Sequence, residues 1–306
     1  MVHAHNRHDY NRAFGFGVLL NVAFVVIEVV YGVAAGSLAL IADAAHNLSD
    51  VASLLLAWGA SALAARSATS RRTYGFRKAT VLASLVSAIL LLAAMGGIAW
   101  EAVGRFRQPA PVDSKTVIVV AAIGVVINTL TALLFVKGQR EDLNIRGAFL
   151  HMAADAAVSL GVVVAGVLIA IGGWLWLDPT VSLLVVGVVV VGTWGLLRDS
   201  LDYTLDAVPK GIDYDAVRQF LLGIDRVTRI HDLHVWPLST TDVALTVHVE
   251  VGDDELDNRF LLGVQEELHR RFGIEHATIQ VEAASDEAVC LLDHDRCQRT
   301  GRLGKA

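Results

Sequence analysis

The chain has 306 residues, of which 54% are hydrophobic, and its mean hydropathy is +0.53. These values exceed what a soluble protein of this length shows and indicate a membrane protein. The formal net charge of −6 gives no sign of a nucleic-acid partner. The chain has only two cysteines, so no disulfide framework is expected.

Six apolar segments are long enough to cross a hydrocarbon core of about 30 Å. We place them at residues 13–34, 38–65, 80–103, 117–136, 147–171 and 179–197. Residues 1–12 are polar and lead straight into the first segment, so we expect a short N-terminal tail and no cleavable signal peptide. The sequence therefore predicts a six-helix transmembrane domain over residues 13–198.

Basic residues are distributed unevenly between the two ends of these segments. One set of loops carries only Arg105, Arg107 and Lys115, whereas the opposite set carries twelve basic residues. Because basic residues favour the cytosolic side, both termini are predicted to be cytosolic. The twelve are Arg7, Arg12, Arg66, Arg71, Arg72, Arg77, Lys78, Lys137, Arg140, Arg146, Arg198 and Lys210.

The second apolar segment carries four polar residues on one helical face. Asp43, His46, Asn47 and Asp50 have the spacing i, i+3, i+4, i+7. An ionisable side chain at such a depth costs about 2.5–3.5 kcal/mol on insertion scales, so this face is a candidate ion site.

The fifth segment repeats the pattern, with His151 and Asp155 again at i and i+4. With the predicted topology, this pair and the pair His46 and Asp50 lie at matching depths near the membrane midplane. Two imidazoles and two carboxylates complete a tetrahedral shell, for which zinc is the best match. The competing interpretation is that the four side chains pair only to fix helix packing.

Besides the two His-x-x-x-Asp pairs, four other polar residues lie within the apolar segments. Asp43 and Asn47 either support the ion site from nearby or form simple hydrogen bonds. Glu28 either carries protons, shapes the site or makes a helix–helix hydrogen bond, and Asn128 is similarly buried in the fourth segment.

Residues 199–306 have a different composition, with 21 acidic against 11 basic residues and a net charge of −10. We predict a cytosolic domain over residues 199–284, followed by a tail of residues 285–306. Hydrophobic patterning predicts helices at 213–223 and 254–272 and strands at 227–236, 241–251 and 277–282. This α-β-β-α-β order suits a three-stranded sheet covered by two helices.

Several motifs together resemble the cation diffusion facilitator family, and more narrowly its bacterial zinc, cadmium and cobalt resistance exporters. They are SLALIADAAHNLSD at 37–50, TYGFRK at 73–78, the second His-x-x-x-Asp, IHDLHVW at 230–236 and HATIQVE at 276–282. The resemblance implies a homodimer that exports divalent metal from the cytosol in exchange for protons. It also implies a ferredoxin-like cytosolic domain at the dimer interface.

The resemblance assigns the transport site to the same two His-x-x-x-Asp pairs. It assigns a cytosolic metal site to His231, His248 and Glu282, with Gln280 near. Strand alternation puts His234 on the face opposite His231, so these two histidines are not expected to bind one ion together.

Two differences from the family pattern concern the loops. Residues 66–78 contain no Asp, Glu, His or Cys, so a loop metal site found in some members is expected to be missing. Residues 137–146 form a short loop without histidine, which fits a bacterial plasma-membrane protein rather than a vesicular one. The basic loop at 66–78 is also expected to contact lipid headgroups.

Near the C-terminus, either Cys290, His294 and Cys297 capture metal or this segment is a disordered tail.

The alternatives to a zinc exporter differ in what they require. Cadmium and cobalt fit the same tetrahedral shell, whereas manganese prefers more oxygen ligands and is the weaker alternative. A membrane metalloenzyme would need a motif such as H-E-x-x-H, which is absent, so no enzymatic activity and no organic cofactor are expected. A membrane-tethered metal sensor without transport stays open.

Overall fold

The computed structural model describes residues 22–136, 143–252 and 258–283. The predictions for the tails at 1–12 and 285–306, including those for Cys290, His294 and Cys297, concern residues outside the described part of the chain. The chain divides into two compact units. One comprises residues 1–58 and 84–197, and the other comprises residues 59–83 and 198–306.

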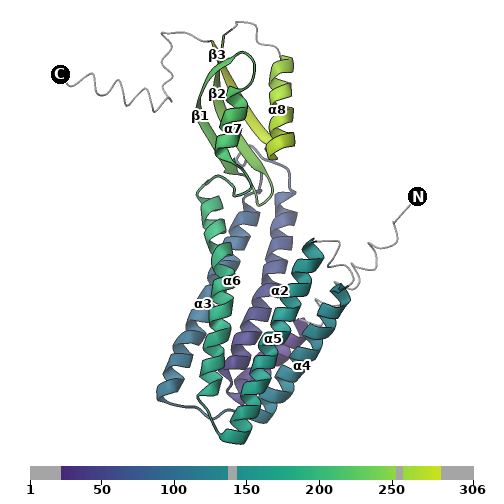
Figure 1. Cartoon of the computed structure of the whole chain (residues 1–306), viewed down its shortest axis with the longest axis vertical. Coiled ribbons are helices and arrows are strands. Elements are labelled where there is room, and N and C mark those ends of the chain that lie inside the picture. The colour runs from purple at the N-terminus through teal and green to yellow at the C-terminus, as the bar shows by residue number, and fades with distance from the viewer. Residues whose placement is uncertain (1–21, 137–142, 253–257, 284–306) are drawn as a thin grey trace, which may run out of the picture. The chain divides into compact units, whose positions relative to one another are not determined.

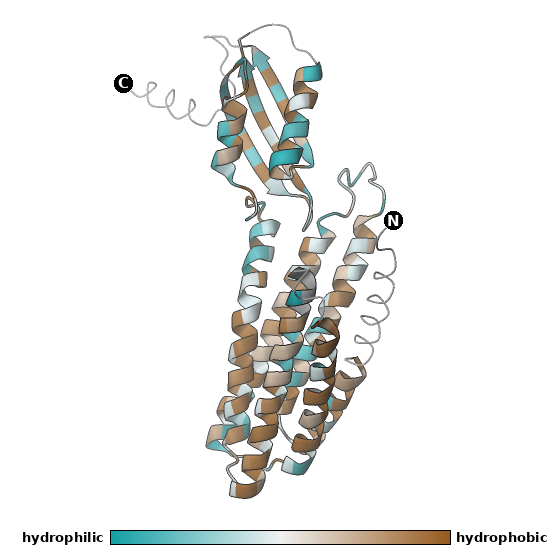
Figure 2. Cartoon of the chain, turned by 45° about the vertical axis from the view of Figure 1, so that its right-hand side comes forward, coloured by the Kyte–Doolittle hydropathy of each residue, from teal (hydrophilic) through white to brown (hydrophobic). Residues whose placement is uncertain are grey.

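The first unit is helical. It contains all or the larger part of each of five long helices, which run side by side (Figure 1). These helices are α2 (Leu38–Ala64), α3 (Ala79–Arg107), α4 (Ser114–Phe135), α5 (Leu143–Gly172) and α6 (Leu177–Thr204). A shorter apolar helix, Val22–Ala35, precedes them. The helices are hydrophobic over most of their length, with a few hydrophilic positions among them (Figure 2).

Length and composition allow four of the described helices to cross a membrane: α3, α4, residues 149–172 of α5, and α6. The prediction of a helical membrane domain is therefore confirmed in this coarser form. Helix α2 is not among these four helices. With 27 residues it is long enough to cross a membrane, but Asp43 and Asp50 lower its mean hydropathy. Helix α4 begins after Asp113, whose side chain accepts hydrogen bonds from the backbone N–H groups of Lys115 and Thr116.

The second unit contains a three-stranded sheet with the order β1-β2-β3. Strands β1 (Val227–Pro237) and β2 (Val243–Val251) are antiparallel, and β2 and β3 (His276–Ala283) are parallel. Helix α7 (Tyr214–Leu222) precedes β1 and helix α8 (Asn258–Phe272) precedes β3. Both helices contribute to one apolar core with the sheet, through residues that include Val217, Leu221, Leu245, Val247, Val264 and Leu268.

Strand β1 is irregular between His231 and His234, where its register with β2 shifts. Asp232 lies in this irregularity with a φ of 50°. The irregularity leaves His231 buried directly opposite His248 of β2, whereas His234 is exposed.

Candidate metal centre

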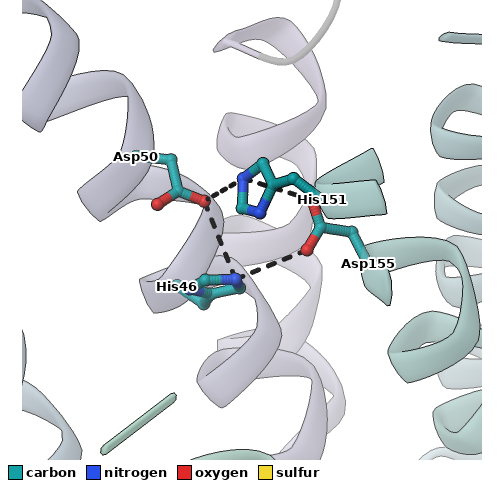
Figure 3. Close-up of side chains that lie close together, drawn as sticks. All are labelled: His46, Asp50, His151 and Asp155. Carbon is teal, nitrogen blue, oxygen red and sulfur yellow. Dashed lines mark ion pairs between the residues drawn. The ribbon is translucent and has the colours of Figure 1, made fainter. Parts of the chain in front are cut away.

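Helices α2 and α5 bring the two predicted His-x-x-x-Asp pairs together (Figure 3). The His46 Nε2 atom lies 3.7 Å from Asp50 Oδ2 and 3.4 Å from Asp155 Oδ1. The His151 Nε2 atom lies 3.2 Å from Asp50 Oδ2 and 3.7 Å from Asp155 Oδ2. Each pair is one helical turn long, so α2 and α5 each present one imidazole and one carboxylate to the same point.

These separations suit a tetrahedral metal ion. With metal–ligand bonds of about 2.0–2.1 Å, the ligand atoms of a tetrahedron lie about 3.3–3.4 Å apart. The four distances in the cluster run from 3.2 to 3.7 Å. One nitrogen or oxygen from each of the four residues also lies within 4.8 Å of the others, so all four could contact one central ion.

The cluster lies at a cavity of about 390 Å³ between α2, α3, α5 and α6. Asp155 is buried and its Oδ2 atom has no hydrogen-bond donor among the described residues. A buried acceptor that lacks a donor is costly unless a cation or a proton occupies the site. The cavity wall combines hydroxyl-bearing residues with apolar ones, including Ser49, Ser53, Ser87, Thr193, Leu91, Val158, Val185, Val188 and Val189.

Three of the other predicted intramembrane polar residues form hydrogen bonds next to this cluster. Asn47 donates from Nδ2 to Glu28 Oε2 at 2.9 Å, which joins α2 to the helix Val22–Ala35. Asp43 accepts a hydrogen bond from the hydroxyl of Ser159 in α5 at 2.9 Å. Asn128 is fully buried in α4. The sequence interpretation did not include Ser159, although it lies one turn after Asp155.

Another buried carboxylate, Asp178, was not predicted from the sequence. It is the acidic residue in the first turn of α6, and it accepts hydrogen bonds from the Ser37 hydroxyl at 2.6 Å and the Leu38 backbone N–H at 2.9 Å. Arg105 lies 3.4 Å from the same carboxylate. Asp178 therefore caps the start of α2, the helix that carries His46 and Asp50.

In the sheet domain, a second cluster joins His231, His248 and Glu282. The His248 Nδ1 atom lies 2.8 Å from Glu282 Oε1, and the His231 Nε2 atom lies 3.5 Å from Glu282 Oε2. Gln280 donates from Nε2 to Glu282 Oε1 at 2.9 Å. Asp232 lies beside this cluster, with Oδ2 3.8 Å from His248 Nε2. Its other oxygen, Oδ1, lies 3.0 Å from Nε2 of the exposed His234.

Two family models together match nearly the whole described chain. The model of a cation efflux transmembrane domain matches residues 16–204. The model of a cation efflux protein cytoplasmic domain matches residues 209–284. The chain belongs to the cation efflux family. The resemblance to the cation diffusion facilitators is thus confirmed.

Curated relatives span almost the same length as this cation efflux protein. The cation efflux system protein CzcD of Alcaligenes sp. (strain CT14) is 36% identical over 295 residues, covering 95% of this chain and 93% of the relative. The cadmium, cobalt and zinc/H⁺–K⁺ antiporter of Bacillus subtilis is 33% identical and covers 92% of each chain. The zinc transporter ZitB of Escherichia coli is 38% identical, over 88% of this chain and 86% of the relative.

A solved structure covers the C-terminal part alone. It is the metal-bound C-terminal domain of the CzcD transporter from Cupriavidus metallidurans, 34% identical over 23% of this chain and 99% of that chain, with a TM-score of 0.22.

Proposed function

We propose that this cation efflux protein exports zinc from the cytosol in exchange for protons, by alternating access. The observation that carries the proposal is the cluster of His46, Asp50, His151 and Asp155, whose ligand atoms all lie within 4.8 Å of one another. A set of two imidazole nitrogens and two carboxylate oxygens matches the ligand preferences of Zn²⁺. The names of the relatives from Escherichia coli and Bacillus subtilis support a substrate of this class.

The ligand set also limits which other metals compete. Cadmium and cobalt fit a tetrahedral shell of the same composition and are the nearest alternatives to zinc. Manganese prefers a shell richer in oxygen, so we propose that it is a poor substrate.

Proton exchange follows from the same atoms that bind the metal. Only a neutral imidazole nitrogen binds zinc, and the ordinary pKa of histidine is about 6.5, so protons and zinc compete for His46 and His151 near neutral pH. Metal entry from the cytosol would release protons, and metal exit outside would allow the histidines to take protons up again.

We propose a bacterial plasma-membrane topology with six spanning helices and both termini in the cytosol. Helix α2 and the segment that contains Val22–Ala35 would join the four clearly apolar helices. In this topology the cavity residues Ser53, Thr193 and Leu196 lie toward the cytosolic ends of α2 and α6. The cavity therefore fits a state in which the metal site is reached from the cytosol.

We propose that residues 199–284 form a ferredoxin-like domain that binds regulatory metal and dimerises. His231, His248 and Glu282 supply three ligands in this domain. Residues 199–306 carry a net charge of −10, so two copies repel one another unless bound cations reduce the repulsion. Zinc in the cytosol would draw the two domains together and favour the transporting state. We propose no enzymatic role.

The experiment that tests the proposed function is zinc flux into proteoliposomes that contain the full chain. An imposed pH gradient should drive zinc accumulation, and collapse of the gradient with an ionophore should stop it. Protein-free vesicles control for leakage. Tight zinc binding without flux under either condition would contradict the transport proposal and favour the membrane-tethered sensor.

A further inference from the structure

Two carboxyl groups are buried in the interior of the helical unit, on helices that contain no lysine or arginine. Glu28, on the helix Val22–Ala35, and Asp43, on α2, are each 0% exposed, and Asn47, one turn after Asp43 on the same face of α2, donates a hydrogen bond to Glu28 at 2.9 Å. Residues 22–64, 116–136 and 147–172 contain no Lys or Arg. Two adjacent buried carboxylates without a cation strongly disfavour double ionisation.

The hydrogen-bond donors around this pair account for only half of its oxygens. Glu28 Oε2 accepts from Asn47, and Asp43 Oδ2 accepts from Ser159. Glu28 Oε1 and Asp43 Oδ1 are buried and find no donor among the described residues. An ionised carboxylate only accepts, so a contact between two carboxyl groups needs a proton between them. One shared proton would satisfy both remaining oxygens.

The buried amide of Asn128 lies on the face of α4 that points toward the helix Val22–Ala35 and α5. A side chain at Gly124 would meet Phe24 of the first described helix and Ser159 of α5, so this face of α4 points toward both helices. Asn128 lies four residues further on the same face. It is 0% exposed, and neither atom of its amide has a hydrogen-bond partner among the described residues. This amide offers both a donor and an acceptor for a proton or a water molecule.

The same two helices carry the pair's partners and the metal cluster. Along α2, Asp43 lies one turn before His46 and Asn47, and along α5, Ser159 lies one turn after Asp155. The ionisable groups that act on Glu28 are Asp43 of α2 and Asp155 of α5, and Asp43 also interacts with His46 of α2, while α4 contributes the neutral Asn128. A divalent cation bound one turn away would favour the doubly ionised pair, because Coulomb interactions are strong in a low-dielectric interior.

We propose that Glu28 and Asp43 form a proton-binding site that is separate from the metal ligands. The pair holds one proton between Glu28 Oε1 and Asp43 Oδ1 while the metal cluster is empty. When a divalent metal ion binds, the O–H bond breaks, the proton leaves to solvent, and both carboxylates are ionised. When the metal leaves, one proton returns. This inference rests on the proposed function, since it adds one proton to those exchanged by the histidines.

The test counts protons released when zinc binds to the purified full-length protein. Calorimetry in buffers of different ionisation enthalpy gives this number for the wild type and for Glu28→Gln, which keeps the size of the side chain and cannot ionise. We expect the variant to release about one proton fewer per zinc ion. Asp43→Asn should show the same deficit. Glu101→Gln, which removes an exposed carboxylate on α3, should leave the count unchanged.

Difference infrared spectroscopy on the wild type provides a readout that needs no variant. Zinc should remove the absorption band of a protonated carboxyl group, and this change should be missing in Glu28→Gln. An unchanged proton count in the folded variants, or no protonated-carboxyl band in the zinc-free wild type, would overturn the inference. Proton-driven zinc flux in the wild type with either of these results would contradict this proton site and leave the transport proposal intact.

Discussion

The His46 Nε2 atom lies 3.4 Å from Asp155 Oδ1, although the two residues belong to different helices, α2 and α5. His151 of α5 makes the reciprocal contact with Asp50 of α2. Each helix thus contributes its imidazole to the other helix's carboxylate. This crossed arrangement makes the cluster depend on the relative position of the two helices, so a change in their packing would separate the four side chains.

Removing one carboxylate from this cluster should abolish transport. We expect Asp155→Asn and Asp50→Asn each to weaken zinc binding at this site by more than about 100-fold, because even partners outside the ligand shell contribute 10–100-fold in metal sites. Zinc flux in proteoliposomes and zinc titration of the purified protein measure both effects. Glu101→Gln is the matched control, because it removes an exposed carboxylate from the same helical unit. Near-normal flux in either aspartate variant would exclude the cluster as the transport site.

Much of this site could be predicted from the sequence because its two halves are local. The i and i+4 spacing fixes the position of His46 relative to Asp50 and of His151 relative to Asp155 whenever the segments are helical. Hydropathy then predicts matching depths for the two halves. The meeting of these residues in the structure depends on no irregular backbone.

The contacts that support the site could not be predicted in the same way. Asp178 is an acidic residue in the first turn of α6, where it would normally be taken as favourable to the helix dipole of α6 itself. Its partners Ser37 and Arg105 are distant in the sequence, and no periodicity connects them. In the sheet domain, strict strand alternation cannot show the irregularity at Asp232 that leaves His231 opposite His248.

Zinc binding to the transport site should weaken as the pH falls. Protonated imidazole cannot bind metal, so affinity should drop between about pH 7.5 and about pH 5.5, around the ordinary histidine pKa of about 6.5. Competition with a fluorescent zinc indicator over this range measures the change. In a His46→Asn variant the affinity should be lower throughout and its pH dependence shallower. A pH-independent affinity in the wild type would contradict proton competition at the histidines.

Exchange of one nitrogen ligand for oxygen should shift the metal preference. His46→Asp converts the shell from two nitrogens and two oxygens to one nitrogen and three oxygens, which favours harder cations. We expect the ratio of manganese to zinc transport to rise by about tenfold or more, consistent with the preference of manganese for oxygen. Flux assays with each metal at equal concentration measure this ratio, and Glu101→Gln, which changes an exposed carboxylate on α3, serves as the control. An unchanged ratio in His46→Asp would indicate that His46 does not bind the metal.

Asp178 should contribute much more to stability than an exposed acid that contacts the same arginine. Asp178→Ala leaves the mostly buried Arg105 without this partner and uncaps α2, and breaking a buried pair costs about 3–5 kcal/mol. Glu101, 60% exposed and 3.5 Å from Arg105, is the matched comparison, and Glu101→Gln should cost at most about 1 kcal/mol. Denaturant unfolding in detergent measures both variants. Equal destabilisation by the two substitutions would show that the buried contact has no special role.

The cluster in the sheet domain should bind zinc independently of the membrane site. Asp155→Asn disables the membrane site, so the zinc binding that remains in this full-length variant reports on the sheet domain. Adding His248→Ala removes one of three ligands there and should abolish this binding or weaken it by about 10-fold or more. With the membrane site intact, His248→Ala should reduce transport without abolishing it. The defect should be larger at low salt, because two domains of net charge −10 then repel over a longer distance.

His269→Ala is the matched control for this prediction, because His269 is an exposed histidine of α8 that lies 3.4 Å from Glu275 and does not belong to the cluster. It should leave both zinc binding and flux unchanged. Calorimetry on the full chain and flux at two ionic strengths separate the two parts of the hypothesis. Unchanged zinc binding in His248→Ala would refute the metal site in the sheet domain. A transport defect of equal size at low and high salt would instead refute charge relief as the way in which bound metal promotes transport.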